Sequence, residues 1–147
     1  MIHIGIDPGK SGGIAWIEDG EPAQAVKMPE TEADLWVLLL RIRNIEWVRI
    51  GVMPHAIIEK VHSMPKQGVK STFTFGKGYG SLLMALTAAG IPFEEVPPGT
   101  WMKAMGCLTK GDKNVSKRKA QQLFPHLKVT HAIADALLIA EYGRRSR

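Results

Sequence analysis

Alternating apolar and polar residues open the chain and predict a series of short strands. Isoleucines at every second position mark a strand over residues 1–7, and a second apolar run covers residues 12–18. Asp19-Gly20 is a typical hairpin turn, so residues 22–28 are expected to return as a third strand. The chain is therefore expected to begin with three antiparallel strands.

The pattern then changes to helical spacing and back. Thr31 can cap a helix that runs to about residue 44, because leucines recur on one face after it. The apolar, β-branched residues 55–61 predict a fourth strand, and residues 48–52 are interpreted as its lead-in. Residues 62–80 are rich in glycine and predict a loop, from which a helix continues to about residue 89.

The last third of the chain contains one more strand and is otherwise helical. Residues 91–96 predict the fifth strand, and residues 100–105 a short helix. A basic helix is predicted over residues 115–124, and Thr130 can cap a final alanine-rich helix that ends near residue 143. This order of elements predicts an α/β fold, a mixed five-stranded sheet flanked by helices, in a single domain over residues 1–147.

Composition narrows the class of protein. Hydrophobic residues make up 45% and charged residues 22%, as in ordinary globular domains. No apolar run approaches the roughly 20 residues of a membrane span, so we expect no membrane partner. Cys107 is the only cysteine, which excludes a disulfide framework and a zinc knuckle. Because the N-terminus has a strand pattern and not that of a secretory signal, we expect a cytoplasmic protein.

Positive charge is concentrated in one segment. The net charge is +5, and five basic residues fall within ten positions that contain one acid, Asp112. Neutralising phosphates releases counterions, so such a cluster favours binding of a polyanion such as nucleic acid. A solvated helix face is the alternative. The five residues are Lys110, Lys113, Lys117, Arg118 and Lys119.

Three acids stand in otherwise apolar segments. Asp7 ends the first predicted strand, Glu59 ends an apolar run in the fourth, and Asp135 lies in the last helix. Burying an unpaired carboxylate is costly, so such groups usually have a partner. Convergent carboxylates in a basic protein point to a divalent metal site that acts on a phosphate backbone. Each acid alone would be interpreted as a solvent-facing end of its element, but the ordered set favours the site.

Short motifs with these acids occur in order along the chain. They lie at residues 5–9, 57–60, 59–68, 71–76, 98–103, 123–125 and 134–137. Together they resemble the RuvC family of Holliday junction resolvases, within the ribonuclease H-like superfamily. The segments that follow Glu59 are similar to the phage-type branch in particular. A single motif has low specificity, but the ordered set covers nearly the whole chain.

This resemblance implies a Mg²⁺-dependent endonuclease that resolves four-way DNA junctions by paired nicks. It implies two Mg²⁺ ions per active site, replaceable by Mn²⁺, with Asp7 bridging them and Glu59 and Asp135 as flanking ligands. A further acid that is usual in the family is absent, and His131, four residues before Asp135, is the candidate for its role. His131 would bind metal or transfer a proton.

A homodimer is expected because paired nicks in a nearly two-fold symmetric junction require two active sites. We place its interface on the predicted helix around residues 82–86, with the small residues Ala85, Ala88 and Ala89.

Aromatic residues beside cations predict further contacts with DNA. Phe73 and Phe75 are candidates for stacking on unpaired bases at the branch point, although core packing is the alternative for one of them. In the basic cluster, Lys113 and Lys117 are the candidates for contact with the scissile phosphate. The cations near the aromatics are Lys66, Lys70 and Lys77.

Two other phosphate-binding classes are excluded. Gly5 and Gly9 enclose three residues where a Walker loop needs four, and this segment joins two predicted strands. An actin-like or sugar-kinase ATPase needs two such domains, whereas 147 residues hold one. Two alternatives stay open: a nuclease of broader specificity, for branched DNA or RNA–DNA hybrids, and a junction-binding module without catalysis.

Overall fold

Five strands form one mixed sheet. The structure, a computed structural model, describes residues 1–62 and 68–147. β1, β2 and β3 pair antiparallel, whereas β4 runs parallel to β1 and β5 runs parallel to β4. The spatial order is β3-β2-β1-β4-β5, which confirms the predicted mixed five-stranded sheet. The strands are β1 (Ile2–Asp7), β2 (Gly13–Glu18), β3 (Gln24–Lys27), β4 (His55–Glu59) and β5 (Phe93–Val96).

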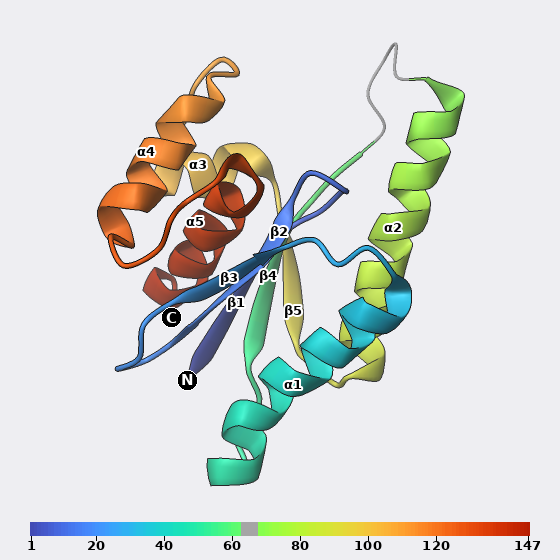
Figure 1. The fold of residues 1–147 in the computed structure, drawn as a ribbon, viewed down its shortest axis with the longest axis vertical. Helices are drawn as coiled ribbons and strands as arrows, with labels where there is room; N and C mark the ends of the chain where they lie inside the picture. Colours follow the sequence, from blue (N-terminus) through green and yellow to red (C-terminus); the bar gives the residue numbers. More distant parts are fainter. Residues whose placement is uncertain (63–67) are drawn as a thin grey trace.

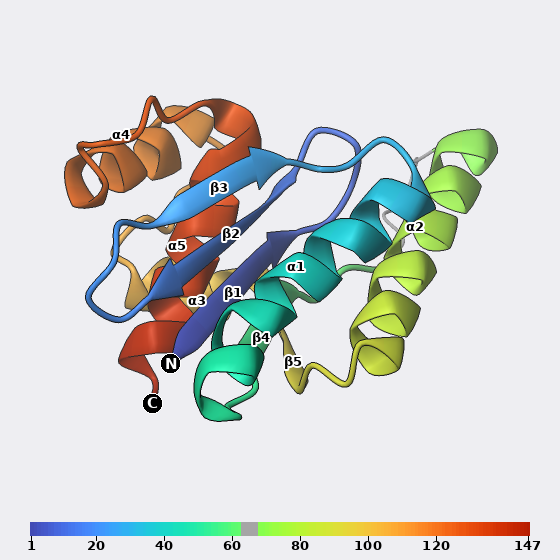
Figure 2. The same cartoon turned by 60° about the horizontal axis from the view of Figure 1, so that its bottom comes forward.

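Helices cover both faces of this sheet. When the sheet is seen close to edge-on, it separates α1 and α2 from α3, α4 and α5 (Figure 1). Figure 2 shows α1 on the near side of the strands and α5 on the far side. The predicted α/β architecture is therefore confirmed. The helices are α1 (Glu32–Ile50), α2 (Val69–Ala88), α3 (Pro98–Ala104), α4 (Lys113–Leu123) and α5 (His131–Arg145).

The two faces of the sheet follow from alternation in the central strands. Ile2, Ile4 and Ile6 of β1 are fully buried in the cluster that includes residues of α1 and α2. Ile58 of β4 belongs to the same cluster, whereas its neighbour Ile57 packs with residues of α5. Because successive side chains of a strand point to opposite faces, the odd-numbered residues of β1 and β4 face α5.

Glycines allow α5 to lie directly on the sheet. A Cβ atom at Gly5 would stand 2.2 Å from the carbonyl oxygen of Ala136, and one at Gly13 would stand 2.6 Å from that of Ala132. Both distances are far below van der Waals contact, so a larger residue at either position would push the helix away. These contacts set the height of α5 above β1 and thereby the position of its first turns.

α1 is longer than predicted. It extends to Ile50, so the interpretation of residues 48–52 as the lead-in to the fourth strand is wrong for residues 48–50. Val48 and Ile50 are 80% and 58% exposed, and Gly51 ends the helix in the left-handed conformation with φ 69°. The strand preference of β-branched residues is weak and depends on packing. Here the helix continues until Gly51, a residue that tolerates the positive φ of a helix end.

α2 begins earlier than predicted. It starts at Val69, so the prediction of a loop is wrong for residues 69–80. Glycines lower helix propensity, but the burial of Leu82 and Leu86 against the sheet stabilises the helix that contains them. Apart from the backbone of the helix itself and the neighbours in the chain, no atom of the described residues lies within 4 Å of where Cβ atoms would stand on Gly76, Gly78 and Gly80.

The remaining helices follow the prediction closely. α4 begins at Lys113, two positions before its predicted start, and Thr130 is the N-cap residue of α5 but makes no side-chain capping bond. α5 passes through residue 143 and ends at Arg145, because Gly143 serves for close packing on Ile57 and not as a helix end. None of the helices in the described residues has the length and apolarity of a membrane span.

Candidate functional site

Two of the predicted acids end neighbouring parallel strands. Asp7 is the last residue of β1, and Glu59 is the last residue of β4. Ile6 pairs with Ile58 in the parallel register, so the next residue of each strand lies level with the other. Strand alternation places both acids on the face that α5 covers. Their carboxyl groups therefore project from adjacent positions at one end of the sheet.

The third acid comes to the same place on α5. Burial, together with the charges of Asp135 and Glu59, raises the pKa of Asp7 to about 8. Burial also raises the pKa of Glu59 and of Asp135, and the charge of Asp135 adds to the rise at Glu59. The structure thus brings the three acids within electrostatic reach of one another. The close approach of α5 to the glycines of β1 and β2 is what makes this possible.

Asp135 has both polar neighbours and an unsatisfied oxygen. Burial is the main cause of its raised pKa, which a hydrogen bond from Ser116 and the charges of Lys113 and His131 partly counteract. Its Oδ1 atom is buried and has no hydrogen-bond partner among the described residues. Because a buried carboxylate oxygen without a partner is costly, this atom is a natural ligand for a cation or a donor.

Lys113 links the basic helix to the acids. It is the first residue of α4 and follows the cap residue Asp112, which accepts a hydrogen bond from the amide of Asn114 over 2.9 Å. Its side chain is exposed, and its charge lowers the pKa of both Asp7 and Asp135. A cation in this position can meet a phosphate that approaches the carboxylates.

Trp101 is a site residue that the sequence prediction missed. Its side chain is fully buried in the core beneath α5. Its Nε1 atom also donates a hydrogen bond to Oε2 of Glu59 over 2.8 Å. The sequence carried one signal for this role, because Trp101 lies within the motif at residues 98–103.

The donor set of the site fits a divalent cation. Carboxylate oxygens are preferred ligands of Mg²⁺ and Mn²⁺, and Asp7, Glu59 and Asp135 supply them at one place. Over residues 1–62 and 68–147, however, no three His, Cys, Asp or Glu side chains already stand as a complete ligand set. The site therefore fits a cation by donor chemistry and location, although its side chains are not arranged as a complete ligand set.

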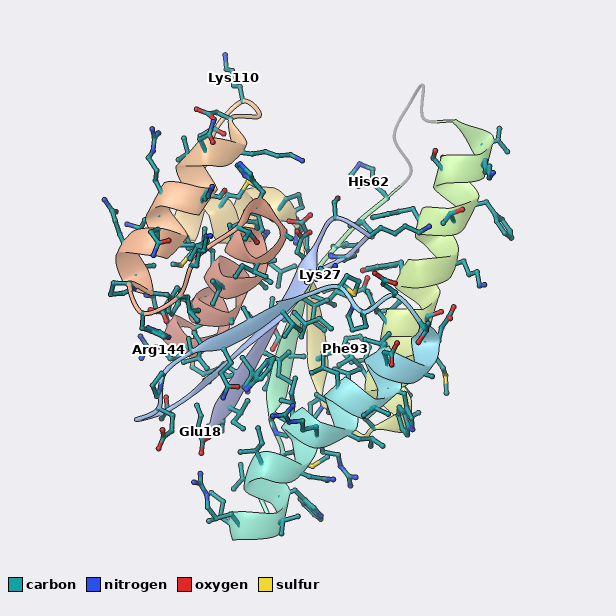
Figure 3. All side chains as sticks on the ribbon, viewed as in Figure 1. Glu18, Lys27, His62, Phe93, Lys110 and Arg144 are labelled. Carbon is teal, nitrogen blue, oxygen red and sulfur yellow. The ribbon has the colours of Figure 1, made fainter. Side chains whose placement is uncertain are left out.

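The predicted basic residues lie on α4 and in the loop before it. Lys110 projects away from the molecule at the end of that loop (Figure 3). Lys110, Lys113 and Arg118 are exposed, whereas Lys117 and Lys119 are half-buried. Lys117 is thus less accessible than Lys113, which leaves Lys113 as the better placed of the two candidates for a phosphate contact.

The arginines at the C-terminus have ion-pair partners. Arg144 and Arg145 donate to Glu141 over 2.8 and 2.7 Å, and Arg147 donates to Glu94 over 2.8 Å. These pairs neutralise part of the positive charge at this end of the chain.

The structure distinguishes the two candidate aromatics. Phe73 is 75% exposed on α2, whereas Phe75 is partly buried and its ring packs over Gly9. Phe73 is therefore free to stack on a base, and the alternative of packing applies to Phe75. Lys70 is exposed, and Lys77 lies 3.7 Å from Glu32. The predicted contact residue Lys66 lies outside the described residues.

A cleft of about 610 Å³ lies between the turn after β1, the start of α1, and α2. Its walls include Lys10, Thr31, Ser71, Phe75 and Ser81. The turn after β1 directly follows Asp7, so the cleft lies at the same end of the sheet as the three acids. It is on the opposite face, because it is formed by α1 and α2 and not by α5.

Comparisons with known proteins agree with this fold. No protein-family model and no curated protein matches the chain. Among solved structures, Thermus thermophilus RuvC matches with a TM-score of 0.59 and 19% identity over 99% of this chain and 96% of that chain. T. thermophilus RuvC in complex with a Holliday junction substrate matches with a TM-score of 0.61 and 20% identity over the same shares. At this identity the likeness shows the fold, a mixed five-stranded sheet with flanking helices.

Proposed function

We propose that the chain is a divalent-metal-dependent endonuclease that cuts branched DNA and resolves four-way junctions. The observation that carries the proposal is the convergence of Asp7, Glu59 and Asp135, three partly buried acids from distant segments, on one face of the sheet. The fold is that of RuvC structures, one of which holds a Holliday junction substrate. The segments that follow Glu59 support the phage-type branch.

The three acids would hold Mg²⁺ or Mn²⁺. Bound there, two divalent ions would activate the attacking water and stabilise the leaving oxygen of the phosphodiester. Asp7 and Glu59 supply oxygens from strand ends, which keep ligands rigid. Ser116 holds Asp135 through a hydrogen bond, and Lys113 attracts the scissile phosphate.

His131 would act as a proton carrier or a further ligand. It is exposed at the first position of α5, and its charge lowers the pKa of Asp135. A neutral imidazole accepts a proton or binds metal.

Two surfaces flank the acids and would hold the arms of a junction. α4 offers exposed cations on the α5 side of the sheet, and α2 offers Phe73 and Lys70 on the other side. Phosphates would contact α4 and strengthen binding through counterion release, while the Phe73 ring would stack on an unpaired base at the branch.

A two-fold homodimer would supply the second active site that paired nicks require. The interface that the sequence placed around residues 82–86 needs correction, because Leu82, Leu86 and Ala89 are buried in the core of this chain. The outer side of α2, where Met84 is 62% exposed, is the part of that helix available to a partner. Sedimentation equilibrium would test the dimer, and a monomer at micromolar concentration would refute it.

A panel of DNA substrates tests the proposed activity. Purified protein with Mg²⁺ is offered a four-way junction, a replication fork, a flap and an RNA–DNA hybrid. We expect symmetric nicks in the four-way junction that Asp7→Asn abolishes, with junction binding kept in Ca²⁺. Rapid cutting of the hybrid alone would refute the proposal.

A junction-binding module without catalysis is the second candidate. The absence of a preformed metal-ligand set in the described part of the chain favours it. Binding of the four-way junction in Mg²⁺ and in Mn²⁺, without any strand scission, would support this candidate over the first.

A further inference from the structure

The Glu59 carboxylate accepts a hydrogen bond from an indole N–H group. Many buried carboxylates have a cation as their partner instead. Nε1 of Trp101 donates to Oε2 of Glu59 over 2.8 Å, between residues that are 42 positions apart. We propose that Trp101 is a positioning residue, which holds Glu59 in the orientation of a metal ligand. The inference rests on the proposed metal-dependent activity and deepens it.

The pairing of β4 with β5 places the indole of Trp101 beside Glu59. Val96 of β5 pairs with Glu59 of β4, and the carbonyl of Val96 accepts a hydrogen bond from the amide of Lys60 over 2.8 Å. The chain then turns at Pro97 into α3, which begins at Pro98 and carries Trp101. The strand pairing and the rigid prolines thus fix the short connection from the partner of Glu59 to its hydrogen-bond donor.

Burial prevents the indole from moving. Trp101 is 0% exposed and belongs to the cluster that contains Met105, Phe124 and Leu137. In a close-packed core a large ring cannot change rotamer without opening a cavity. A buried indole is therefore a fixed donor, whereas a lysine or arginine on the surface would move with its flexible side chain.

The chemistry of the donor suits a cation site. An indole N–H is neutral, so it orients the Glu59 carboxylate without neutralising the charge that attracts a divalent cation. An arginine or lysine in its place would form an ion pair and compete with the cation. Donation to Oε2 leaves Oε1 for coordination. Outer groups that orient a ligand in this way commonly change metal affinity or activity by about 10- to 100-fold when removed.

Trp16 offers a matched control. It is 5% exposed, so it is buried almost as deeply as Trp101, but its Nε1 atom has no hydrogen-bond partner among the described residues. It also lies in the cluster on the opposite face of the sheet. Trp101→Phe and Trp16→Phe therefore replace similarly buried indoles, and only the first removes a hydrogen bond to Glu59.

The test compares these two variants with the wild-type protein. Thermal unfolding of each variant first measures the loss of core packing. Calorimetry with Mn²⁺ and protein alone, and four-way-junction cleavage against Mg²⁺ concentration, then measure the metal dependence. We expect Trp101→Phe to weaken Mn²⁺ binding and to raise the Mg²⁺ midpoint, each by about 10- to 100-fold. Cleavage at saturating Mg²⁺ should stay near the wild-type rate, and Trp16→Phe should leave both midpoints unchanged.

Nuclear magnetic resonance of the indole N–H groups gives a readout that does not depend on cleavage or on the folding of Trp101→Phe. In the wild-type protein, the Trp101 indole signal should exchange slowly with solvent and should shift when Mg²⁺ is added. Glu59→Gln should shift the same signal and leave that of Trp16 in place. A Trp101 signal that responds to neither change would overturn the proposal.

The outcomes also separate this inference from the proposed function. Equal midpoints for Trp101→Phe, Trp16→Phe and the wild type would show that Trp101 serves the core alone, even if the protein is a junction resolvase. If the wild type cuts no branched DNA but binds Mn²⁺, and Trp101→Phe weakens that binding, the nuclease proposal fails and the positioning role stands. A wild-type protein that binds no Mn²⁺ would refute both.

Discussion

Asp7 should make the metal-free protein lose stability as the pH rises. Burial and the neighbouring acids raise its pKa from 3.8 to about 8 in the folded protein. In the unfolded chain the carboxyl group titrates near its ordinary value, so between these two pH values the folded state binds a proton that the unfolded state does not. Stability then falls with rising pH by about 1.4 kcal/mol per unit, or about 4 kcal/mol from pH 5 to pH 8.

Asp7→Asn removes this dependence because an amide does not ionise. Relative to the wild type, the variant should gain about 4 kcal/mol between pH 5 and pH 8. For a chain of this length, 1 kcal/mol shifts the midpoint of thermal unfolding by roughly 2–4 °C, so the gain amounts to about 10 °C. The same substitution should abolish junction cleavage. A residue that makes the fold less stable and is needed for activity is typical of a functional site.

The measurement is thermal unfolding by circular dichroism at pH 5, 6, 7 and 8 in the presence of a chelator. Asp112→Asn is the control, because it removes one exposed carboxylate and asparagine also caps a helix well. The same series for Asp112→Asn measures how much the loss of one exposed carboxylate changes stability at each pH. If Asp7→Asn and the wild type differ by the same amount at every pH, the electrostatic account of the three acids is wrong.

Four further substitutions test the packing and the DNA contacts. Gly5→Ala should lower stability by several kcal/mol and abolish cleavage, because its Cβ atom would stand 2.2 Å from the carbonyl oxygen of Ala136. Gly76→Ala, in open space on α2, should instead stabilise the protein by about 0.5–1 kcal/mol. Chemical denaturation of both variants measures the two changes. Lys113→Gln should reduce the slope of log affinity against log salt by about one, and an unchanged slope in a filter-binding series would exclude a phosphate contact. Phe73→Ala should weaken junction binding by about 1–3 kcal/mol with little change in duplex binding, and equal losses on both substrates would argue against stacking at the branch.

Local signals in the sequence were sufficient for most of the fold. Strand alternation identified β1 and β2, and the hairpin turn between β2 and β3 was read from Asp19-Gly20. The errors fell where local preference and tertiary packing disagree. Val48 and Ile50 have strand preference but end a helix, and the glycines of α2 lower helix propensity in a helix that is held by buried leucines.

For the candidate site, too, the sequence identified some residues but could not predict the contacts between distant segments. The sequence supplied Asp7, Glu59 and Asp135 as acids at the ends of apolar segments or within one. It could not distinguish Phe73 from Phe75, because the difference is a contact between the Phe75 ring and Gly9 far along the chain. It also could not assign the Trp101 donor, since a buried indole and a hydrogen-bonded one look alike in a sequence.

By itself, then, the sequence determined most of the segments that form strands and helices and the residue types that carry the chemistry. Those features depend on the period of apolar residues and on the turns between them. Only the tertiary structure decided that the three acids meet. The three acids come together because β1 and β4 pair in parallel register and because α5 packs closely on Gly5 and Gly13. Both are contacts between distant segments, and the energy of such contacts depends on shape and burial, which no local pattern encodes.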